Sequence, residues 1–137
     1  MKSKVMLVCA TAAIAVISLS LVACVAAPKQ VSVDASYTGK EVEIAVDGSL
    51  IVTLESNATT GFQWQLVEIT DQTVLEEVEH EYVAPESDPP LMGAGGEEVW
   101  TFKALKKGTT ELSMEYSQPW EGGTKAAETF SLTIIVK

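Results

Sequence analysis

The sequence predicts an all-β domain: an immunoglobulin-like antiparallel β-sandwich of seven or eight short strands with no disulfide. Apolar and polar residues alternate in short runs along most of the chain, and turn residues separate these runs at regular spacing. Outside an apolar segment near the N-terminus, no part of the chain shows a helical period. Both cysteines, Cys9 and Cys24, lie within or at the end of that segment, so the domain has no pair to bridge.

The alternation also places the strands and their inward faces. Short runs at residues 31–33 and 42–46 come first, and the Asp47-Gly48 pair after the second is a strong turn signal. A further strand is expected at about 74–82. In five other runs the apolar residues occupy every second position and therefore share one face. The expected inward residues are Leu50, Val52, Leu54, Phe62, Trp64, Leu66, Trp100, Phe102, Ala104, Leu112, Met114, Tyr116, Phe130, Leu132, Ile134 and Val136.

The connections between these strands fall into two sets. Successive antiparallel strands place every second connection at the same end of a sandwich. From the strand that starts at Leu50, the connections at 56–61, 84–97 and 118–126 alternate with those at 70–73 and 106–109. The first set is long and rich in unusual residues, and the second set is tight. The sequence therefore predicts three loops at one end of the domain, as in antibody domains.

The N-terminus has the features of a secretory signal. Two lysines are followed by an apolar or small stretch at 5–23, and Leu21-Val22-Ala23-Cys24 resembles the lipobox of bacterial lipoproteins. We expect a signal peptide at 1–23, a lipid on Cys24, a tether at 24–29 and the folded domain at 30–137. The alternative is an uncleaved membrane anchor, because about 19 apolar residues nearly span a bilayer. Either interpretation places the domain outside the cytoplasm. The lipid would hold it on the outer side of the cytoplasmic membrane, or in the outer membrane or periplasm.

Charge narrows the possible partners. The chain has nine lysines, no arginine and 19 acidic residues, and removal of the two signal lysines leaves a net charge of −12. Such a domain repels nucleic acid and anionic membrane surfaces. We therefore expect no nucleic-acid partner, and membrane contact through the lipid alone.

Catalytic and cofactor chemistry find little support. The one histidine, His80, lies in the acidic run 76–81, and no serine sits in a nucleophile elbow. Glu79, His80 and Glu81 are adjacent on a strand and point to opposite faces, so a solvated acidic strand is favoured over a metal site. The glycines at 93–96 do not lead from a strand into a helix, which argues against a phosphate loop. No enzyme activity, cofactor or metal is expected.

The three loops have features that suit recognition of another protein. The second offers backbone with few side chains, which can share hydrogen bonds with an extended partner. In the third, Trp120 follows Pro119 outside any alternating pattern, as an interface anchor would. The alternative is that Trp120 folds back over the end of the sandwich. Trp64 and Trp100 fall on inward faces and are expected in the core.

These loops carry a resemblance to the chagasin-type inhibitors of papain-like cysteine peptidases. The residues concerned are Asn57-Ala58-Thr59-Thr60-Gly61, Leu91-Met92-Gly93-Ala94-Gly95-Gly96 and Gln118-Pro119-Trp120. They are similar in order and spacing to the family's Asn-Pro-Thr-Thr-Gly, Gly-x-Gly-Gly and Arg-Pro-Trp motifs. The resemblance covers about residues 30–137. It implies an immunoglobulin-like inhibitor whose loops enter the active cleft of the peptidase. We expect the protein to be a monomer.

The resemblance also implies a role for each loop. Thr59 and Thr60 would lie nearest the catalytic cysteine and histidine of the peptidase. The stretch from Gly93 to Gly96 would follow the substrate groove on one side, with Leu91 and Met92 available to an apolar pocket. Trp120 would pack on an aromatic surface on the other side. Such an inhibitor blocks the cleft without offering a well-placed peptide bond to the thiolate.

Two positions depart from the family pattern. Ala58 replaces a proline, which would cost about 0.4–1 kcal/mol of preorganisation, and Gln118 replaces an arginine and removes a charged donor. The rival interpretation is a cell-surface or periplasmic sandwich for adhesion or scaffolding, whose loops bind another ligand. The fold alone does not separate the two, because sandwiches serve many functions.

Overall fold

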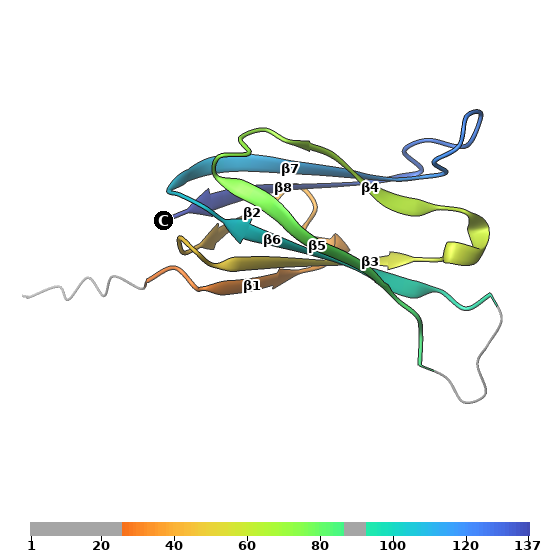
Figure 1. The fold of residues 1–137 in the computed structure, drawn as a ribbon, viewed down its shortest axis with the longest axis horizontal. Helices are drawn as coiled ribbons and strands as arrows, with labels where there is room; N and C mark the ends of the chain where they lie inside the picture. The colour runs from red at the N-terminus through yellow and green to blue at the C-terminus, as the bar shows by residue number, and fades with distance from the viewer. Residues whose placement is uncertain (1–25, 87–92) are drawn as a thin grey trace, which may run out of the picture.

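The computed structural model describes residues 26–86 and 93–137, and its strands form two layers (Figure 1). Eight strands account for nearly all of the regular structure in these residues, together with two single-turn 3₁₀ helices, η1 (Ala35–Tyr37) and η2 (Ala58–Thr60). The strands are β1 (Gln30–Val33), β2 (Lys40–Ile44), β3 (Ser49–Ser56), β4 (Gln63–Ile69), β5 (Leu75–Val83), β6 (Gly96–Ala104), β7 (Gly108–Ser117) and β8 (Glu128–Val136). No helix within these residues is long and apolar enough to cross a membrane. The expected signal segment and Cys24 lie outside the described residues.

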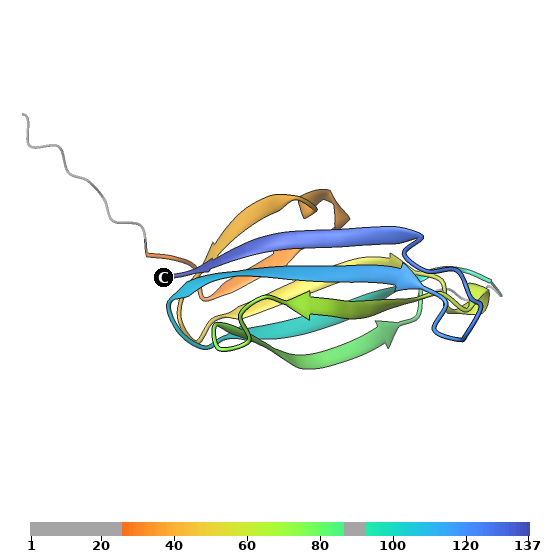
Figure 2. The ribbon, with the colours of Figure 1, turned by 90° about the horizontal axis from the view of Figure 1, so that it is seen from above.

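Each layer is a four-stranded sheet. The strand orders are β1-β3-β6-β5 and β2-β8-β7-β4, so the all-β sandwich predicted from the sequence is confirmed. One detail of the prediction is wrong: the sheets are mixed, because β1 pairs in parallel with β3 and β2 in parallel with β8. Successive strands reverse direction, and β2 joins the opposite sheet from β1 and β3. The two strands that flank it in sequence therefore run the same way and meet as neighbours, as the second view shows (Figure 2).

The core lies between the two sheets, where the alternation predicted it. The inward residues of β3, β6 and β8 are almost completely buried, among them Leu50, Phe102 and Ile134. Of the predicted inward set, Phe62, Leu66 and Tyr116 are only half-buried. A bulge in β4 between Leu66 and Glu68 interrupts its regular register, which ends the strict alternation there.

The edge strand β5 is solvated, as its acidic sequence predicts. Every residue from Glu76 to Val83 is exposed. His80 differs from its neighbours, because its ring stacks on Trp100 of β6 with centroids 3.7 Å apart. Within residues 26–86 and 93–137, no three histidine, cysteine, aspartate or glutamate side chains are grouped in a way that would hold a metal ion.

The residues just before β1 are hydrogen-bonded to the domain. The Ala45 N–H donates to the Pro28 carbonyl (2.8 Å), and the Ser49 N–H donates to the Lys29 carbonyl (2.8 Å). The last two residues of the expected tether are therefore bonded to the domain.

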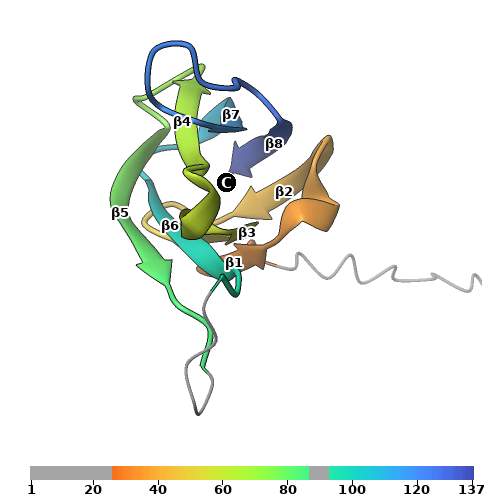
Figure 3. The ribbon, with the colours of Figure 1, turned by 90° about the vertical axis from the view of Figure 1, so that its right-hand side faces the viewer.

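The described parts of the three long connections lie at one end of the sandwich, and the tight turns after β4 and β6 lie at the other (Figure 1). Figure 3 looks directly at the three-loop end, with η2 between the loop after β7 and the described ends of the connection from β5 to β6. We call these connections the first loop (residues 57–62), the second loop (84–95) and the third loop (118–127). The clustering predicted by counting strands is confirmed.

Candidate binding site at the three-loop end

The first loop is a single 3₁₀ turn that begins at Asn57. The Asn57 Oδ1 accepts hydrogen bonds from the Thr59 N–H (3.1 Å) and the Thr59 hydroxyl (2.6 Å), as the side chain of an N-cap residue does. The Thr60 hydroxyl donates to the Asn57 carbonyl (2.6 Å). Gly61 ends the turn with a φ of 77°, a value that favours glycine. The turn holds Ala58, Thr59 and Thr60 exposed at the end of the molecule.

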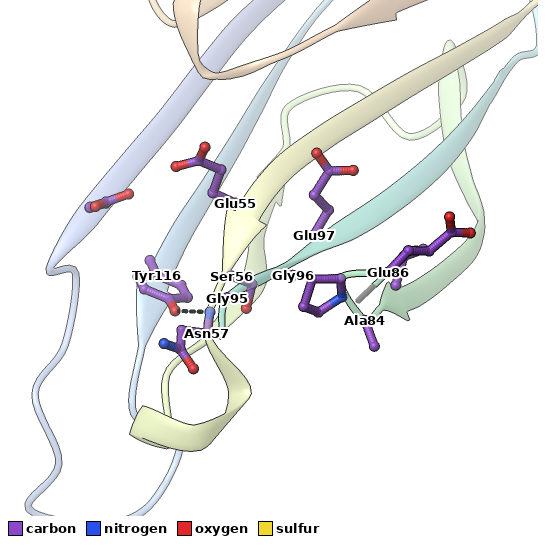
Figure 4. Close-up of a pocket in the computed structure, with 12 residues that line it drawn as sticks. Glu55, Ser56, Asn57, Ala84, Glu86, Gly95, Gly96, Glu97 and Tyr116 are labelled. Atoms are coloured by element: carbon purple, nitrogen blue, oxygen red, sulfur yellow. Dashed lines mark hydrogen bonds between the residues drawn. The ribbon is translucent and has the colours of Figure 1, made fainter. Parts of the chain in front are cut away.

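Asn57 also connects the first loop to both of its neighbours. Its backbone N–H donates to the Tyr116 hydroxyl (2.8 Å), two residues before the third loop. Its Nδ2 donates to the Gly93 carbonyl (3.1 Å) in the second loop. Figure 4 shows Asn57 beside Tyr116, with the bond between them dashed. One asparagine therefore sets the first loop against the other two.

The second loop presents backbone to solvent over a shorter stretch than the sequence indicated. Gly93 and Gly95 are exposed and Ala94 is half-buried. Gly96 is instead buried as the first residue of β6, where it pairs with Ser56 of β3. A Cβ at Gly96 would lie 2.7 Å from the Tyr82 hydroxyl, so this glycine serves close packing of β5 and β6. Leu91 and Met92, also expected to contact a peptidase, lie outside the described residues.

In the third loop, Trp120 lies against the first loop. Its side chain is 50% exposed, and its ring covers Gly61: a Cβ on that glycine would lie 2.3 Å from the Trp120 Cη2. Both sequence-based expectations for Trp120 therefore hold in part, because the ring folds onto the end of the domain and still offers half of its surface. Pro119 before it is exposed.

Gln118 and Lys125 hold the third loop in shape. The Gln118 Oε1 accepts from the Thr124 N–H (2.9 Å), and its Nε2 donates to the Thr60 carbonyl (3.4 Å). The Lys125 Nζ donates to the Trp120 carbonyl (3.0 Å) and to the Gln118 carbonyl. The polar side-chain atoms of Gln118 thus form hydrogen bonds within the chain, at the exposed contact between the third and first loops.

An acidic groove of about 670 Å³ lies beside the loops. It is bounded by the start of the first loop and by the two ends of the second loop. Asn57 and Tyr116 line one side of it (Figure 4). Its carboxylates are exposed and come from Glu55, Glu86, Glu97 and Glu128. The three-loop end therefore carries a negative field that favours approach of a basic surface.

Sequence reasoning missed several residues that shape this end. Tyr116 was expected in the core, yet its hydroxyl reaches the first loop, and Lys125 had no motif to identify it. Glu98 was also missed, and it is buried at 3% exposure beneath the loops. A signal for it was present, because the alternation of Trp100 and Phe102 extended backwards puts Glu98 on the inward face.

The fold and the site define a class of protein: an immunoglobulin-like sandwich with three loops bonded to one another at one end. Residues 43–134 match the model of the chagasin family of peptidase inhibitors, I42, and the chain belongs to that family. The members of this family are peptidase inhibitors and not enzymes, and the chain is therefore not an enzyme.

Individual relatives agree with this assignment. The chain is 32% identical to chagasin of Trypanosoma cruzi over 100 residues, which cover 71% of this chain and 89% of chagasin. It is 25% identical to amoebiasin-2 of Entamoeba histolytica over 97 residues, which cover 70% and 76% of the two chains. The fold resembles the crystal structure of a cysteine protease inhibitor of E. histolytica, with a TM-score of 0.70 at 19% identity over 79% of this chain and 96% of that one.

Proposed function

We propose that this protein is a reversible inhibitor of papain-like cysteine peptidases that blocks the active cleft with its three-loop end. The observation that carries the proposal is the position of Asn57. This residue starts the first-loop motif and bonds to Gly93 of the second loop and to Tyr116 below the third. Asn57 thereby joins the first motif to the second and to the strand that leads into the third, and Gln118 of the third motif bonds to Thr60 of the first.

The first loop is suited to fill a cleft without being cut. Ala58, Thr59 and Thr60 form a closed turn, and the N–H and hydroxyl groups of both threonines donate to Asn57. A peptidase cleaves an extended peptide laid across its thiolate, and a closed turn presents no such peptide bond. In our proposal Thr59 and Thr60 approach the catalytic cysteine and histidine and exclude substrate.

The flanking loops supply affinity on either side. The backbone from Gly93 to Gly95 would lie along one side of the peptidase's substrate groove. The exposed half of Trp120 would pack on an aromatic surface of the peptidase on the other side. Leu91 and Met92 would add contacts to an apolar pocket of the peptidase. Gly96 would act indirectly, because it allows β5 and β6 to pack closely below the second loop. A single copy of the chain provides the whole surface.

The two departures from the family pattern have different consequences. At Ala58 the turn lacks a proline, and the hydrogen bonds that Thr59 and Thr60 donate to Asn57 hold its shape instead. At position 118 the amide of Gln118 bridges two loops, so the missing arginine removes a contact to the peptidase and leaves the loop itself braced.

The function is tested by titration of papain with the purified protein. We expect reversible inhibition, no cleavage of the protein on long incubation, and no effect on serine or metallo-peptidases. Full papain activity at micromolar protein would favour the rival function of an adhesion or scaffolding sandwich.

We also propose that the protein is exported and anchored by a lipid on Cys24. The basic start, the apolar stretch at 5–23 and the sequence Leu21-Val22-Ala23-Cys24 support this proposal. Residues 25–27 then separate the lipid from Pro28, where bonding to the domain begins. Cys24→Ser is expected to yield an unlipidated protein, and an unmodified Cys24 in the wild-type mature protein by mass spectrometry would refute the anchor.

A further inference from the structure

Glu98 of β6 is a buried carboxylate with no part in the loop motifs. Its side chain lies on the inward face next to Trp100 and is nearly inaccessible, with 3% of the residue exposed. The other buried polar residues in the described parts of the chain are Ser56, Thr110 and Ser117, none of which is ionisable. A buried carboxylate is costly unless it is hydrogen-bonded, so the partners of Glu98 indicate what it does.

Glu98 has one partner from each sheet. Its Oε2 accepts from the backbone N–H of Trp64 in β4 (2.9 Å). Its Oε1 bonds to the Nε2 of His80 in β5 (2.7 Å), and the His80 ring stacks on Trp100. β4 is an edge strand, paired only with β7. Glu98 therefore takes the place of a neighbouring strand at the Trp64 N–H and connects two edge strands, β4 and β5, one from each sheet.

These partners lie at the bases of two loops. Trp64 follows the first loop, and its indole N–H donates to the Glu55 carbonyl (2.9 Å) on the strand that enters that loop. Trp64 thus closes the base of the first loop. Glu98 lies just after the second loop on β6, and His80 lies just before it on β5. One carboxylate connects the closed base of the first loop with both stems of the second.

We propose that Glu98 is a positioning residue for inhibition: it fixes the first loop relative to the second, so that both enter the peptidase cleft together. This inference rests on the proposed function of the loops. Burial of a carboxylate costs free energy that its hydrogen bonds only offset, so a gain in stability does not explain a carboxylate here. A fixed spacing of the loops, however, lowers the ordering cost of binding.

The test compares variants of the full chain purified in mild detergent. Glu98→Leu loses both bonds and keeps a side chain suited to the core. Glu98→Gln keeps an oxygen for the Trp64 N–H and an amide group beside His80. Thr110→Val is the matched control: Thr110 is buried at the opposite end, where its Oγ1 accepts from the Asp71 N–H (2.9 Å).

Each variant is measured for inhibition of papain, for thermal unfolding and for the amide NMR signals of Thr59 and Thr60. Glu98→Leu is expected to weaken inhibition about tenfold or more and to shift both signals, because two bonds to a charged group are lost. Glu98→Gln is expected to stay within about threefold of wild type, since neutral bonds replace them. Thr110→Val is expected to lower the melting temperature and to leave inhibition and the two signals unchanged.

A folded Glu98→Leu protein with wild-type inhibition would overturn the proposal. The proposal would also be overturned if Thr110→Val were destabilised as much as Glu98→Leu and lost as much inhibition. If Glu98→Leu does not fold, His80→Phe decides, because it keeps the stack on Trp100 and removes the bond to Glu98. About threefold weaker inhibition by His80→Phe is then expected, and unchanged inhibition with unchanged loop signals overturns the proposal. If the wild type does not inhibit papain, the proposed function fails, while the Thr59 and Thr60 signals still test the positioning role.

Discussion

Two tryptophans show how residues of one type divide between stability and recognition. Trp100 is 4% exposed, with its ring between Phe102 and His80. Trp120 is 50% exposed and touches the domain where its ring covers Gly61. The first side chain is part of the core, and the second is half-exposed at the three-loop end, where we propose that it contacts the peptidase.

The two alanine variants should therefore have opposite effects. Trp100→Ala opens a core cavity and is expected to cost about 3–5 kcal/mol of unfolding free energy. Trp120→Ala is expected to leave the melting temperature nearly unchanged and to weaken peptidase binding by about 2 kcal/mol or more. Thermal melts and inhibition constants decide between the roles. If Trp120→Ala unfolds the domain, or inhibits as well as wild type, the role given to the third loop is wrong.

Gly61 is constrained by its backbone and by the ring above it. Gly61→Ala is expected to cost about 1–2 kcal/mol from the left-handed backbone, and also to weaken inhibition about tenfold by displacing Trp120. Gly39→Ala is the matched control, because Gly39 has the same φ of 77° with nothing within 4 Å of its Cβ position. It should show the stability cost with unchanged inhibition. Equal inhibition by the two variants would contradict the role of the Trp120 contact.

At the scale of elements, the third loop is coupled to the first through Gln118. Gln118→Arg restores the family charge and gives up the amide bonds to Thr124 and Thr60. Both bonds are exposed, so we expect the melting temperature to stay the same while affinity changes for at least some papain-like peptidases. Inhibition constants across a peptidase panel provide the measurement. Identical constants for both proteins throughout the panel would show that position 118 has no part in recognition.

The turn between β4 and β5 offers an independent check at the opposite end. The hydroxyl and backbone N–H of Thr73 donate to the Asp71 carboxylate and hold its pKa below the usual value of 3.8. The stability gained from this turn is therefore present above pH 3.8 and is lost as pH falls through the lower pKa of the folded state. An NMR titration of Asp71 should give a midpoint below 3.8. Asp71→Asn should remove this pH dependence without altering inhibition, and a midpoint at or above 3.8 would contradict the turn geometry.

The elements also show what the sequence can and cannot predict. Strand positions and inward faces followed from alternation, because a two-layer sandwich imposes a period of two on every buried strand. The parallel pairings of β1 with β3 and of β2 with β8 did not follow, since the sheet edge that a short strand joins depends on its neighbours in space. Glu98 was missed for a related reason: its inward position was readable, but its partners on β4 and β5 meet only in the fold.

At the scale of the whole molecule, the sandwich separates its tasks between its two ends. Tight turns close one end, while the other end presents the described parts of three loops, joined by Asn57 and supported by Glu98 from below. Acidic residues line the groove beside these loops. We propose that this acidic end, with its loops bonded to one another, enters a cleft with walls on both sides, which is the central claim about this protein.

That claim is tested most directly by calorimetric binding of the protein to papain before and after its cleft is filled. A peptide-like covalent inhibitor on the catalytic cysteine, which occupies the substrate groove on both sides, leaves the rest of the papain surface free. If the three loops enter the cleft, filling it should weaken binding at least about hundredfold, a loss of about 2.7 kcal/mol. Equal affinity for open and filled papain would place the contact elsewhere and contradict the account.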